Sequence, residues 1–405
     1  MREEARQGRS AGMAVKEGFA RAYRTILDSN LTTLIAVSLL FLVGSGPVKG
    51  FAVTIGIGLL TSLFTAVTLT QLLTEWQIRG RERQPLVLPG VAWLDRLSAR
   101  VPNVMRGRRV GLTLSAVLSL AAVLLYVQPG LKYGVDFTGG TLVEVQAPGV
   151  AADDLRQVLP GQAGVQESEG EGHYLVRLPV AQEPTVAAEQ MEALKASVRD
   201  LSAEAEFPRT EMVGPKVSGD FSDISILAVL LAGAGVLGYL WWRFESHFAL
   251  AATLTIALDL TKTIGFFVLA GVEFNLTAVA ALLALIGYSV NDKVVVFDRV
   301  REQLRLTPDK PLLDVLNESI AATLTRTVFT SVTTLLALLP MALAGGAAVV
   351  SFAQPLLFGV IVGTSSSVFI AAPLLYWLAR RRARRGLAQL QPTAEEVRQR
   401  LAQMP

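Results

Sequence analysis

Five charged residues interrupt long apolar stretches and are the first candidates for chemistry. Asp259 and Lys262 share one stretch, Asp292 and Lys293 share the next, and Arg326 lies near the start of a third. An ionised side chain inside a bilayer is costly unless it is paired or hydrated, so such residues commonly mark ion or proton pathways. Their positions predict a membrane protein that moves charge.

The rise of a helix sets the expected depth of Asp292 and Arg326. Asp292 lies six residues before the inner end of a span expected at 275–298, which is about 9 Å into the membrane at ~1.5 Å per residue. Arg326 lies roughly 6–8 Å inside the next span, 322–344, which returns in the opposite direction. The sequence therefore predicts an acid and a base at similar depth on consecutive antiparallel helices.

A buried carboxylate beside a movable cation can carry a proton. Burial favours the neutral form of Asp292, whereas a nearby guanidinium favours the ionised form, and arginine itself stays charged. Movement of Arg326 would then load or release the proton. We expect Asn291 to belong to this relay, and Ser289, Thr325 and Thr330 to supply supporting polar groups. The alternative is a static ion pair that fixes helix register, with polar neighbours that only pack.

For the remaining charged residues in the apolar stretches, we expect the following contacts. Asp259 and Lys262 lie one helical turn apart, so they are expected to pair with each other, either in support of the relay or as a purely structural contact. Lys293 directly follows Asp292 and must point to another side of the helix. We expect its long side chain to extend toward the cytoplasmic surface of the membrane.

The composition is that of a polytopic membrane protein. Of the 405 residues, 51% are hydrophobic and 18% are charged, against roughly 25% charged in soluble domains. Several apolar windows exceed the ~18 residues that suggest a bilayer span. Eight spans are expected, at about 30–44, 50–73, 109–127, 222–241, 247–270, 275–298, 322–344 and 352–378.

Composition and motifs argue against several other functions. The chain has no cysteine, and its two histidines lie in no ligand-spaced motif, so neither a metal nor another cofactor is expected. It has no nucleophile–base constellation and no phosphate-binding glycine motif, which argues against an enzyme. The net charge of +3 reflects basic cytoplasmic loops rather than nucleic-acid binding.

The distribution of basic residues predicts the orientation. They concentrate before the first span, in 74–108, in 299–321 and from 380 onward, which places both termini in the cytoplasm and 128–221 outside. The expected division is a cytoplasmic amphipathic lead-in at 1–29, two spans at 30–73, a cytoplasmic linker at 74–108, a span at 109–127, an extracytoplasmic domain at 128–221, five spans at 222–378 and a basic cytoplasmic tail at 379–405.

The extracytoplasmic segment predicts a small ferredoxin-like α+β domain. Strands are expected at 142–146, 173–178 and 206–213, and helices at 152–158 and 185–201. This alternation in so short a segment suits that fold.

A glycine motif, YGVDFTGGT at 133–141, leads into the first expected strand. It contains Asp136, Thr138, Gly139 and Gly140. The paired glycines predict a turn that Asp136 could cap. We favour a junction between the preceding span and the outer domain over a direct substrate contact.

An internal repeat extends the architecture. Residues 32–58 align with 333–359 without a gap, at an offset of 301 residues. The shared residues include Thr32 and Thr333, Gly44 and Gly345, and Phe51 and Phe352. The first two spans therefore resemble the end of one repeat, and the last six spans resemble a complete second copy. Repeated halves with a site between them are a common transporter plan.

Several stretches together resemble the SecD/SecF protein-export family. The SecF-like stretches are YGVDFTGGT at 133–141, ALDLTKTIG at 257–265, NLTAVAA at 275–281, IGYSVNDKVVVFDRVRE at 286–302 and NESIAATLTRTVFTSVTTLL at 317–336. Residues 14–73 resemble the last two helices of SecD. The first four SecD helices and the large SecD outer domain have no counterpart, and Lys293 stands where a small polar residue is expected.

The resemblance implies a fused SecD–SecF arrangement related to resistance–nodulation–division (RND) transporters. It implies a proton-driven accessory subunit of the Sec translocase in the bacterial inner membrane, which helps to pull preproteins from the SecYEG channel. It further implies that Asp292 and Arg326 carry the proton, that Asp259 supports them, and that the outer domain moves or contacts substrate.

The partners implied by the resemblance are SecYEG, a SecD-like half in the same or another chain, YajC, unfolded preproteins and membrane lipids. Because one repeat is incomplete, residues 1–405 alone are expected to lack full activity. The alternatives are an RND-type exporter half and a scaffold of the translocon that transports nothing.

Overall fold

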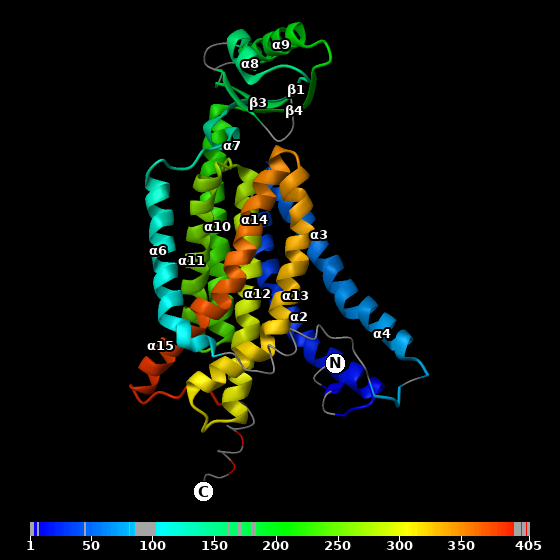
Figure 1. The fold of residues 1–405 in the computed structure, drawn as a ribbon, viewed down its shortest axis with the longest axis vertical. Helices are drawn as coiled ribbons and strands as arrows, with labels where there is room; N and C mark the ends of the chain where they lie inside the picture. Colours follow the sequence, from blue (N-terminus) through cyan, green and yellow to red (C-terminus); the bar gives the residue numbers. More distant parts are fainter. Residues whose placement is uncertain are drawn as a thin grey trace.

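A bundle of long helices carries a small sheet domain at one end in the computed structural model (Figure 1). The structure describes residues 4–5, 8–43, 46–80, 82–85, 103–159, 163–167, 172–179, 181, 184–392, 398 and 402. Helix α2 begins, and helix α15 ends, at the end of the bundle opposite the sheet (Figure 1). Most of the expected linker at 74–108 and part of the tail at 379–405 lie outside the described residues.

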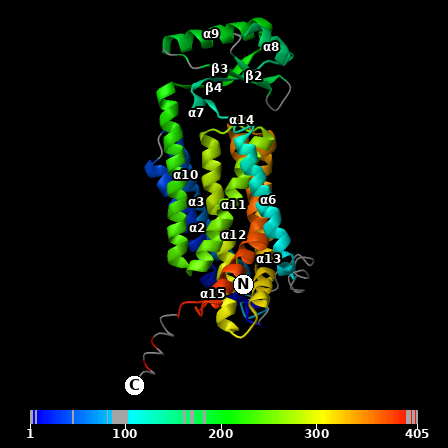
Figure 2. The ribbon, with the colours of Figure 1, turned by 90° about the vertical axis from the view of Figure 1, so that its left-hand side faces the viewer.

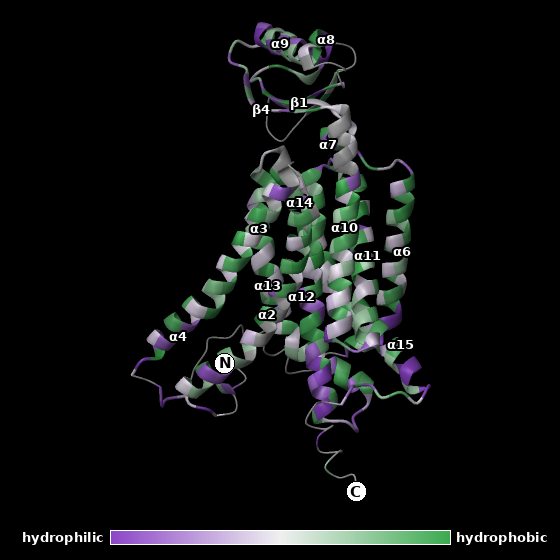
Figure 3. Ribbon diagram, turned by 180° about the vertical axis from the view of Figure 1, so that it is seen from behind, coloured by the Kyte–Doolittle hydropathy of each residue, from purple (hydrophilic) through white to green (hydrophobic). Residues whose placement is uncertain are grey.

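The long helices follow the apolar stretches of the sequence. They are α2 (Ala11–Val43), α3 (Gly46–Phe64), α4 (Thr70–Ile78), α6 (Arg108–Val127), α10 (Pro215–Arg243), α11 (Ser246–Ala270), α12 (Leu276–Leu306), α13 (Leu312–Ala344), α14 (Ala347–Ser366) and α15 (Ala372–Ala383). Apolar residues cover them, and hydrophilic residues gather at the end of the bundle where α15 lies (Figure 3).

Seven helical stretches in the described part of the chain are long and apolar enough to cross a membrane. The expected span at 30–44 falls within α2, whose apolar part, Asn30–Leu39, is shorter. The polytopic fold class is therefore confirmed, and the count of eight spans stays a prediction. The lead-in expected at 1–29 and the first span form one continuous helix in the described residues from Ala11 to Val43.

Helix α12 lies at the centre of the bundle. It packs against α2, α11, α13 and α14, and 83% of its apolar window is buried, against 6% for Ala52–Ile78 on α3 and α4. The latter two helices diverge from the bundle (Figure 1). Helix α10 instead runs beside the bundle from the sheet domain to the opposite end (Figure 2).

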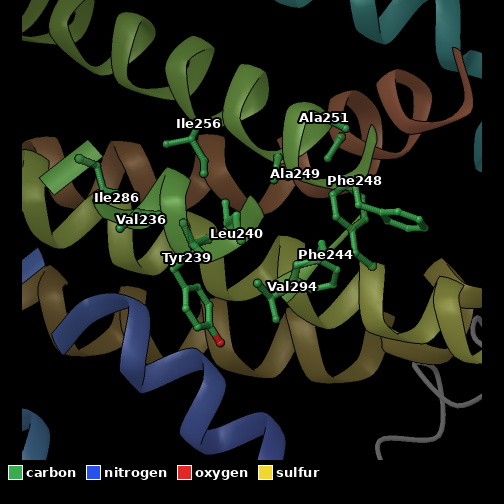
Figure 4. Close-up of a cluster of buried hydrophobic side chains, with 14 of the residues drawn as sticks. Val236, Tyr239, Leu240, Phe244, Phe248, Ala249, Ala251, Ile256, Ile286 and Val294 are labelled. Carbon is green, nitrogen blue, oxygen red and sulfur yellow. The ribbon is translucent and has the colours of Figure 1, made fainter. Parts of the chain in front are cut away.

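Tightly packed apolar side chains hold α10, α11 and α12 together (Figure 4). Phe248 packs edge-on against Phe297 at 5.5 Å between ring centroids, and Leu240, Ile286 and Val294 are buried beside them. Because lipid is as apolar as these side chains, close packing rather than the hydrophobic effect stabilises the contact in a membrane.

The internal repeat is visible in the helix boundaries. Helices α2 and α13 end at Val43 and Ala344, and α3 and α14 begin at Gly46 and Ala347, in both cases at the 301-residue offset found in the sequence. A π-helical segment then interrupts each second helix at nearly the same place, at Thr65–Leu69 in one copy and Ser367–Ala371 in the other. The two copies therefore share a local backbone irregularity as well as sequence.

The sheet domain has the ferredoxin-like topology that the sequence predicts. Its elements are β1 (Gly140–Gln146), α8 (Ala152–Val158), β2 (Gly164–Glu167), β3 (His173–Leu178), α9 (Pro184–Leu201) and β4 (Glu206–Val213). The strands are ordered β2-β3-β1-β4 with antiparallel neighbours. Both helices cover one face of the sheet (Figure 1), over a core that includes Val143, Val176 and Leu194. The sequence analysis missed β2.

Candidate functional site

Three helices meet around the carboxylate of Asp259, which is fully buried near the middle of α11. Its Oδ2 accepts hydrogen bonds from Ser289 Oγ on α12 (2.9 Å) and from Ser366 Oγ at the end of α14 (2.6 Å). Ser366 adjoins the π-helical segment that begins at Ser367. The predicted polar residue Ser289 therefore supports Asp259 rather than Asp292.

Lys293 completes this cluster. Its ammonium lies 3.0 Å from Asp259 Oδ2 and also donates to Ser289 Oγ (2.6 Å) and Ser366 Oγ (3.1 Å). Ser289 and Lys293 are four residues apart, so α12 presents both on the side that faces α11. The expectation that Lys293 extends toward the membrane surface is wrong: the residue is fully buried, because an internal carboxylate satisfies its charge.

Lys262 makes a looser contact with the same carboxylate. Its Nζ lies 3.6 Å from Asp259 Oδ1, one helical turn along α11, which confirms the expected pairing. Neither Lys262 Nζ nor Asp259 Oδ1 has a hydrogen-bond partner in the described part of the chain. Asp259 is thus flanked by two lysines that differ greatly in how they are held.

Asp292 lies on another side of α12, near its middle, and is 5% exposed. Its Oδ2 is buried without a hydrogen-bond partner among the described residues. The positive charges that act on it are those of Lys293 and Arg326. An ionised acid in this setting is poorly compensated, so proton binding would remove a buried charge.

A polar contact between helices fixes the level of Asp292 relative to α13. Tyr288 Oη donates to Ser331 Oγ at 3.2 Å. One turn farther from the sheet domain lie Asp292 on α12 and Thr327 on α13, the residue after Arg326. The matched depth expected of Asp292 and Arg326 is therefore supported by this register.

Arg326 does not make the direct ion pair with Asp292 that we expected. Among the described residues no ion pair joins them, and the Arg326 side chain is exposed on the surface of the bundle. Their charges nevertheless interact. The arrangement is a buried acid with its cation held at a distance.

The other predicted polar residues have differing surroundings. Asn291 is partly buried, and its Oδ1 lacks a hydrogen-bond partner in the part of the chain that is described. Thr330 donates to the carbonyls of Arg326 and Thr327 on its own helix, and Thr325 is partly buried on α13. Of these three, only Asn291 presents an uncommitted polar atom near Asp292.

A cavity of about 250 Å³ lies beside Asn291, between the two copies of the repeat. Its lining residues are Asn30, Thr33, Ala284, Gly287, Tyr288, Asn291, Thr334, Leu356 and Val360. The close approach of α2 to α12 depends on Gly287, where a Cβ atom would lie 2.5 Å from Thr33 Oγ1. A cavity of this size has room for several water molecules, each of which occupies ~30 Å³, and Asn30, Thr33 and Asn291 are among the polar groups that could bind them.

The glycine motif joins the sheet domain to the start of α12. Asp136 on the short helix α7 (Val135–Thr138) accepts a hydrogen bond from Leu276 N, the first residue of α12, at 2.9 Å. Thr138 donates to Gly134 O. Gly139 and Gly140 have positive φ angles of 71° and 113°, and a Cβ on Gly140 would lie 2.6 Å from Leu178 O, so glycine is required there.

An ion pair and an aromatic cluster connect the two sides of the same junction. Arg177 on β3 donates to Glu273, in the loop before α12, at 2.5 Å and to Tyr133 O at 3.1 Å. Phe137 and Phe274 stack at 5.7 Å between ring centroids. The end of α12 nearest the sheet domain is thus tied to β3 and α7, whereas its middle carries Asp292.

The acids of this junction should respond to pH. Burial raises the pKa of Glu273 against the opposing charges of Arg177 and Lys132, and burial also raises the pKa of Asp136. The stability contributed by an acid with a raised folded-state pKa is fully present below its unfolded pKa, about 4.3 for Glu, and is lost as pH rises through the folded value.

Replacing Glu273 with Gln should therefore flatten the pH dependence of stability. We expect wild type to lose stability relative to Glu273→Gln as the pH rises above the unfolded pKa of about 4.3, as measured by thermal unfolding in detergent. The exposed Glu192, replaced in the same way, is the control and should keep the wild-type profile. Parallel profiles for wild type and Glu273→Gln would contradict this account.

The sequence analysis missed two contacts in these sites, the one that Ser366 makes with Asp259 and the ion pair of Arg177 with Glu273. The role of Ser366 is not apparent locally, because it is a serine in an apolar helix far along the chain from Asp259. The Arg177–Glu273 pair joins residues 96 positions apart. The placement of Ser289 and Lys293 on one face of α12 was the available signal for the Lys293 contact.

The fold and the buried charges define a class: a multi-pass helical membrane protein of the transporter type, with a repeated helical unit. Family models narrow it further. Residues 193–381 match the C-terminal model of protein export membrane protein SecD/SecF, residues 127–147 match the SecD/SecF GG motif, and residues 1–104 match the MMPL family.

Individual relatives agree. The chain is 39% identical to protein translocase subunit SecF of Desulfurispirillum indicum, across 72% of this chain and 96% of that protein. It is 41% identical to protein translocase subunit SecDF of Brucella abortus, across 93% of this chain and 50% of that protein. The chain belongs to the SecD/SecF family, as its motifs suggested.

A solved structure matches the same region. The crystal structure of SecDF from Thermus thermophilus, described as a translocon-associated membrane protein, superposes with a TM-score of 0.79 at 32% identity and covers 94% of this chain. The chain spans about half the length of its SecDF relatives, 50% of one and 52% of that crystallised chain. It corresponds to a SecF-like part with a portion of SecD.

Proposed function

We propose that this chain is the proton-driven part of an accessory subunit of a Sec-type protein translocase. The observation that carries the proposal is the buried carboxylate of Asp292, which has an uncompensated oxygen and two cations within electrostatic reach. Its relatives are named protein translocase subunits, which supports a protein as the cargo, and we propose that this cargo is an unfolded preprotein.

The proton step follows from the charges around Asp292. With Arg326 held away, a proton arriving through the cavity beside Asn291 neutralises the acid. Approach of the guanidinium favours the ionised acid and expels the proton. The cation stays charged throughout, so the step needs no cofactor and breaks no covalent bond, and the chain acts as a transporter component rather than an enzyme.

Helix α12 can pass this event to the sheet domain. Its middle carries Asp292, and its first residue is bound by Asp136 of the glycine motif. A displacement of α12 along or about its axis would move α7 and, through Arg177 and Glu273, the end of β3. The domain would thereby convert proton movement into motion on the far side of the membrane.

The proposed setting is the bacterial inner membrane, with both termini in the cytoplasm and the sheet domain outside. The basic residues at the end of the bundle opposite the sheet support this orientation. The proposed partners are the SecYEG channel, YajC and a SecD-like half that completes the first repeat. The divergence of α3 and α4 from the bundle (Figure 1) supports a further membrane partner there.

The proposal is tested in membrane vesicles that contain the Sec channel, the chain and a SecD-like half. We expect the chain to increase the yield of exported preprotein only while a proton gradient is present, and a protonophore to remove the increase. An increase that survives the protonophore would contradict proton coupling.

A further inference from the structure

The ammonium of Lys293 occupies a cage of four oxygen atoms drawn from three helices. They are Asp259 Oδ2 at 3.0 Å, Ser289 Oγ at 2.6 Å, Ser289 O at 3.1 Å and Ser366 Oγ at 3.1 Å. Lys293 and Asp259 are both fully buried. In an ordinary buried ion pair the ammonium contacts one carboxylate, whereas the Lys293 ammonium is surrounded by a shell of four oxygen atoms.

The shell is organised toward a cation. Both serine hydroxyls donate their protons to Asp259 Oδ2, so their lone pairs face the ammonium. A carboxylate, two hydroxyls and a backbone carbonyl are the hard oxygen donors that alkali and alkaline-earth cations prefer. The cage has a single carboxylate, whose other oxygen already lies 3.6 Å from the ammonium of Lys262. A monovalent cation therefore suits it better than a divalent one.

We propose that the junction of α11, α12 and α14 is a binding site for a monovalent cation, and that Lys293 fills it with a tethered ammonium. The lysine thereby makes the junction independent of free ions. If the side chain is shortened, the same oxygens should accept Na⁺, K⁺ or a small ammonium ion from solution.

Lys262 shows that proximity to Asp259 is not sufficient for such a site. Its Nζ lies 3.6 Å from Asp259 Oδ1 and has no hydrogen-bond partner in the described residues. No shell of oxygens surrounds it there. Lys262 is therefore a suitable control for Lys293, because it lies beside the cage rather than inside it.

The test is cation rescue of Lys293→Ala in the whole chain, purified in lipid nanodiscs. Thermal unfolding is followed while NaCl, KCl or methylammonium chloride replaces N-methylglucamine chloride at constant ionic strength. Glucamine is too large for the space left by one side chain. We expect the midpoint of Lys293→Ala to rise by several degrees along a saturable curve with at least one small cation, as for any ligand of the folded state.

Wild type should show no such cation preference, and Lys262→Ala should show none either. The double variant Asp259→Asn/Lys293→Ala removes the carboxylate that would hold the cation, so it should lose the rescue. If Lys293→Ala fails to fold in glucamine, the yield of monodisperse protein prepared with each cation replaces the midpoint.

Equal midpoints or equal yields of Lys293→Ala in all cations would overturn the proposal. So would the same rescue in Lys262→Ala, because that result would reflect a general salt effect. Rescue that persists in the double variant would also overturn it, since the cation would then bind without the carboxylate of Asp259. None of these outcomes depends on export activity, so they leave the proposed function separately testable.

Discussion

Replacing Asp292 with Asn is expected to abolish the proton-dependent increase in export and leave membrane insertion intact. Asparagine matches the shape of the protonated acid but cannot release a proton, so the cycle stops in its neutral state. The side chain is almost fully buried and makes few polar contacts, which is why the fold should tolerate the change. Export from vesicles with an imposed proton gradient measures the effect.

The control for this variant is Asp309→Asn, which makes the same chemical change in an exposed turn between α12 and α13. It should export as wild type does. Gradient-dependent export by Asp292→Asn at the wild-type level would exclude the acid as the coupling group. The chain would then fit better as a scaffold of the translocon.

Replacing Asp259 with Asn is expected to give the largest loss of stability. It leaves the ammonium of Lys293 in the interior without a counter-charge, and breaking a buried pair in this way costs about 3–5 kcal/mol. The serines cannot compensate, because they contribute hydroxyl groups rather than charge. The free energy of unfolding of the purified chain is the measurement, with Asp309→Asn again as the control.

A loss below about 1 kcal/mol, the range of exposed ion pairs, would show that the Asp259–Lys293 contact is not the buried pair described here. The two substitutions, Asp259→Asn and Asp292→Asn, are expected to have different effects. One buried acid is tightly bound and should matter for stability, whereas the other is poorly compensated and should matter for coupling.

Sequence periodicity predicted much of the fold. The expected helix at 152–158 and strand at 173–178 coincide with α8 and β3, since both are bounded by turn residues and have clear apolar patterns. Strand β2 was missed because it has four residues, GVQE, with Val165 as its one large apolar side chain. This segment forms a strand because it pairs with β3, and not because its own sequence favours one.

Repeat alignment also predicted where helices end, but not how they deviate. The offset of 301 residues reproduces the ends of α2 and α13. The π-helical segments that follow have no distinctive composition, TAVTL in one copy and SVFIA in the other. Such segments arise where tertiary contacts displace the hydrogen-bond ladder, so a single sequence does not reveal them.

The candidate site could be predicted as a set of residues but not as a set of contacts. The energetic cost of burying charge selected Asp259, Lys262, Asp292 and Lys293. The acid that Lys293 contacts depends on the rotation of α12 about its axis relative to α11. The sequence gives one indication of this rotation, since Ser289 lies one turn from Lys293 on the same face of α12. The separation of Arg326 from Asp292 depends on how α13 packs, which depth alone does not determine.

Infrared difference spectroscopy of the chain in lipid tests the central claim most directly, because it observes the protonation of individual carboxyl groups. Other acids, such as Asp136 and Glu273, also bind protons on acidification. We predict that the protonated-carboxyl signal of wild type contains one component that is kept in Asp259→Asn and lost in Asp292→Asn. A component that survives in Asp292→Asn and disappears in Asp259→Asn would assign the mobile proton to Asp259 and contradict the account.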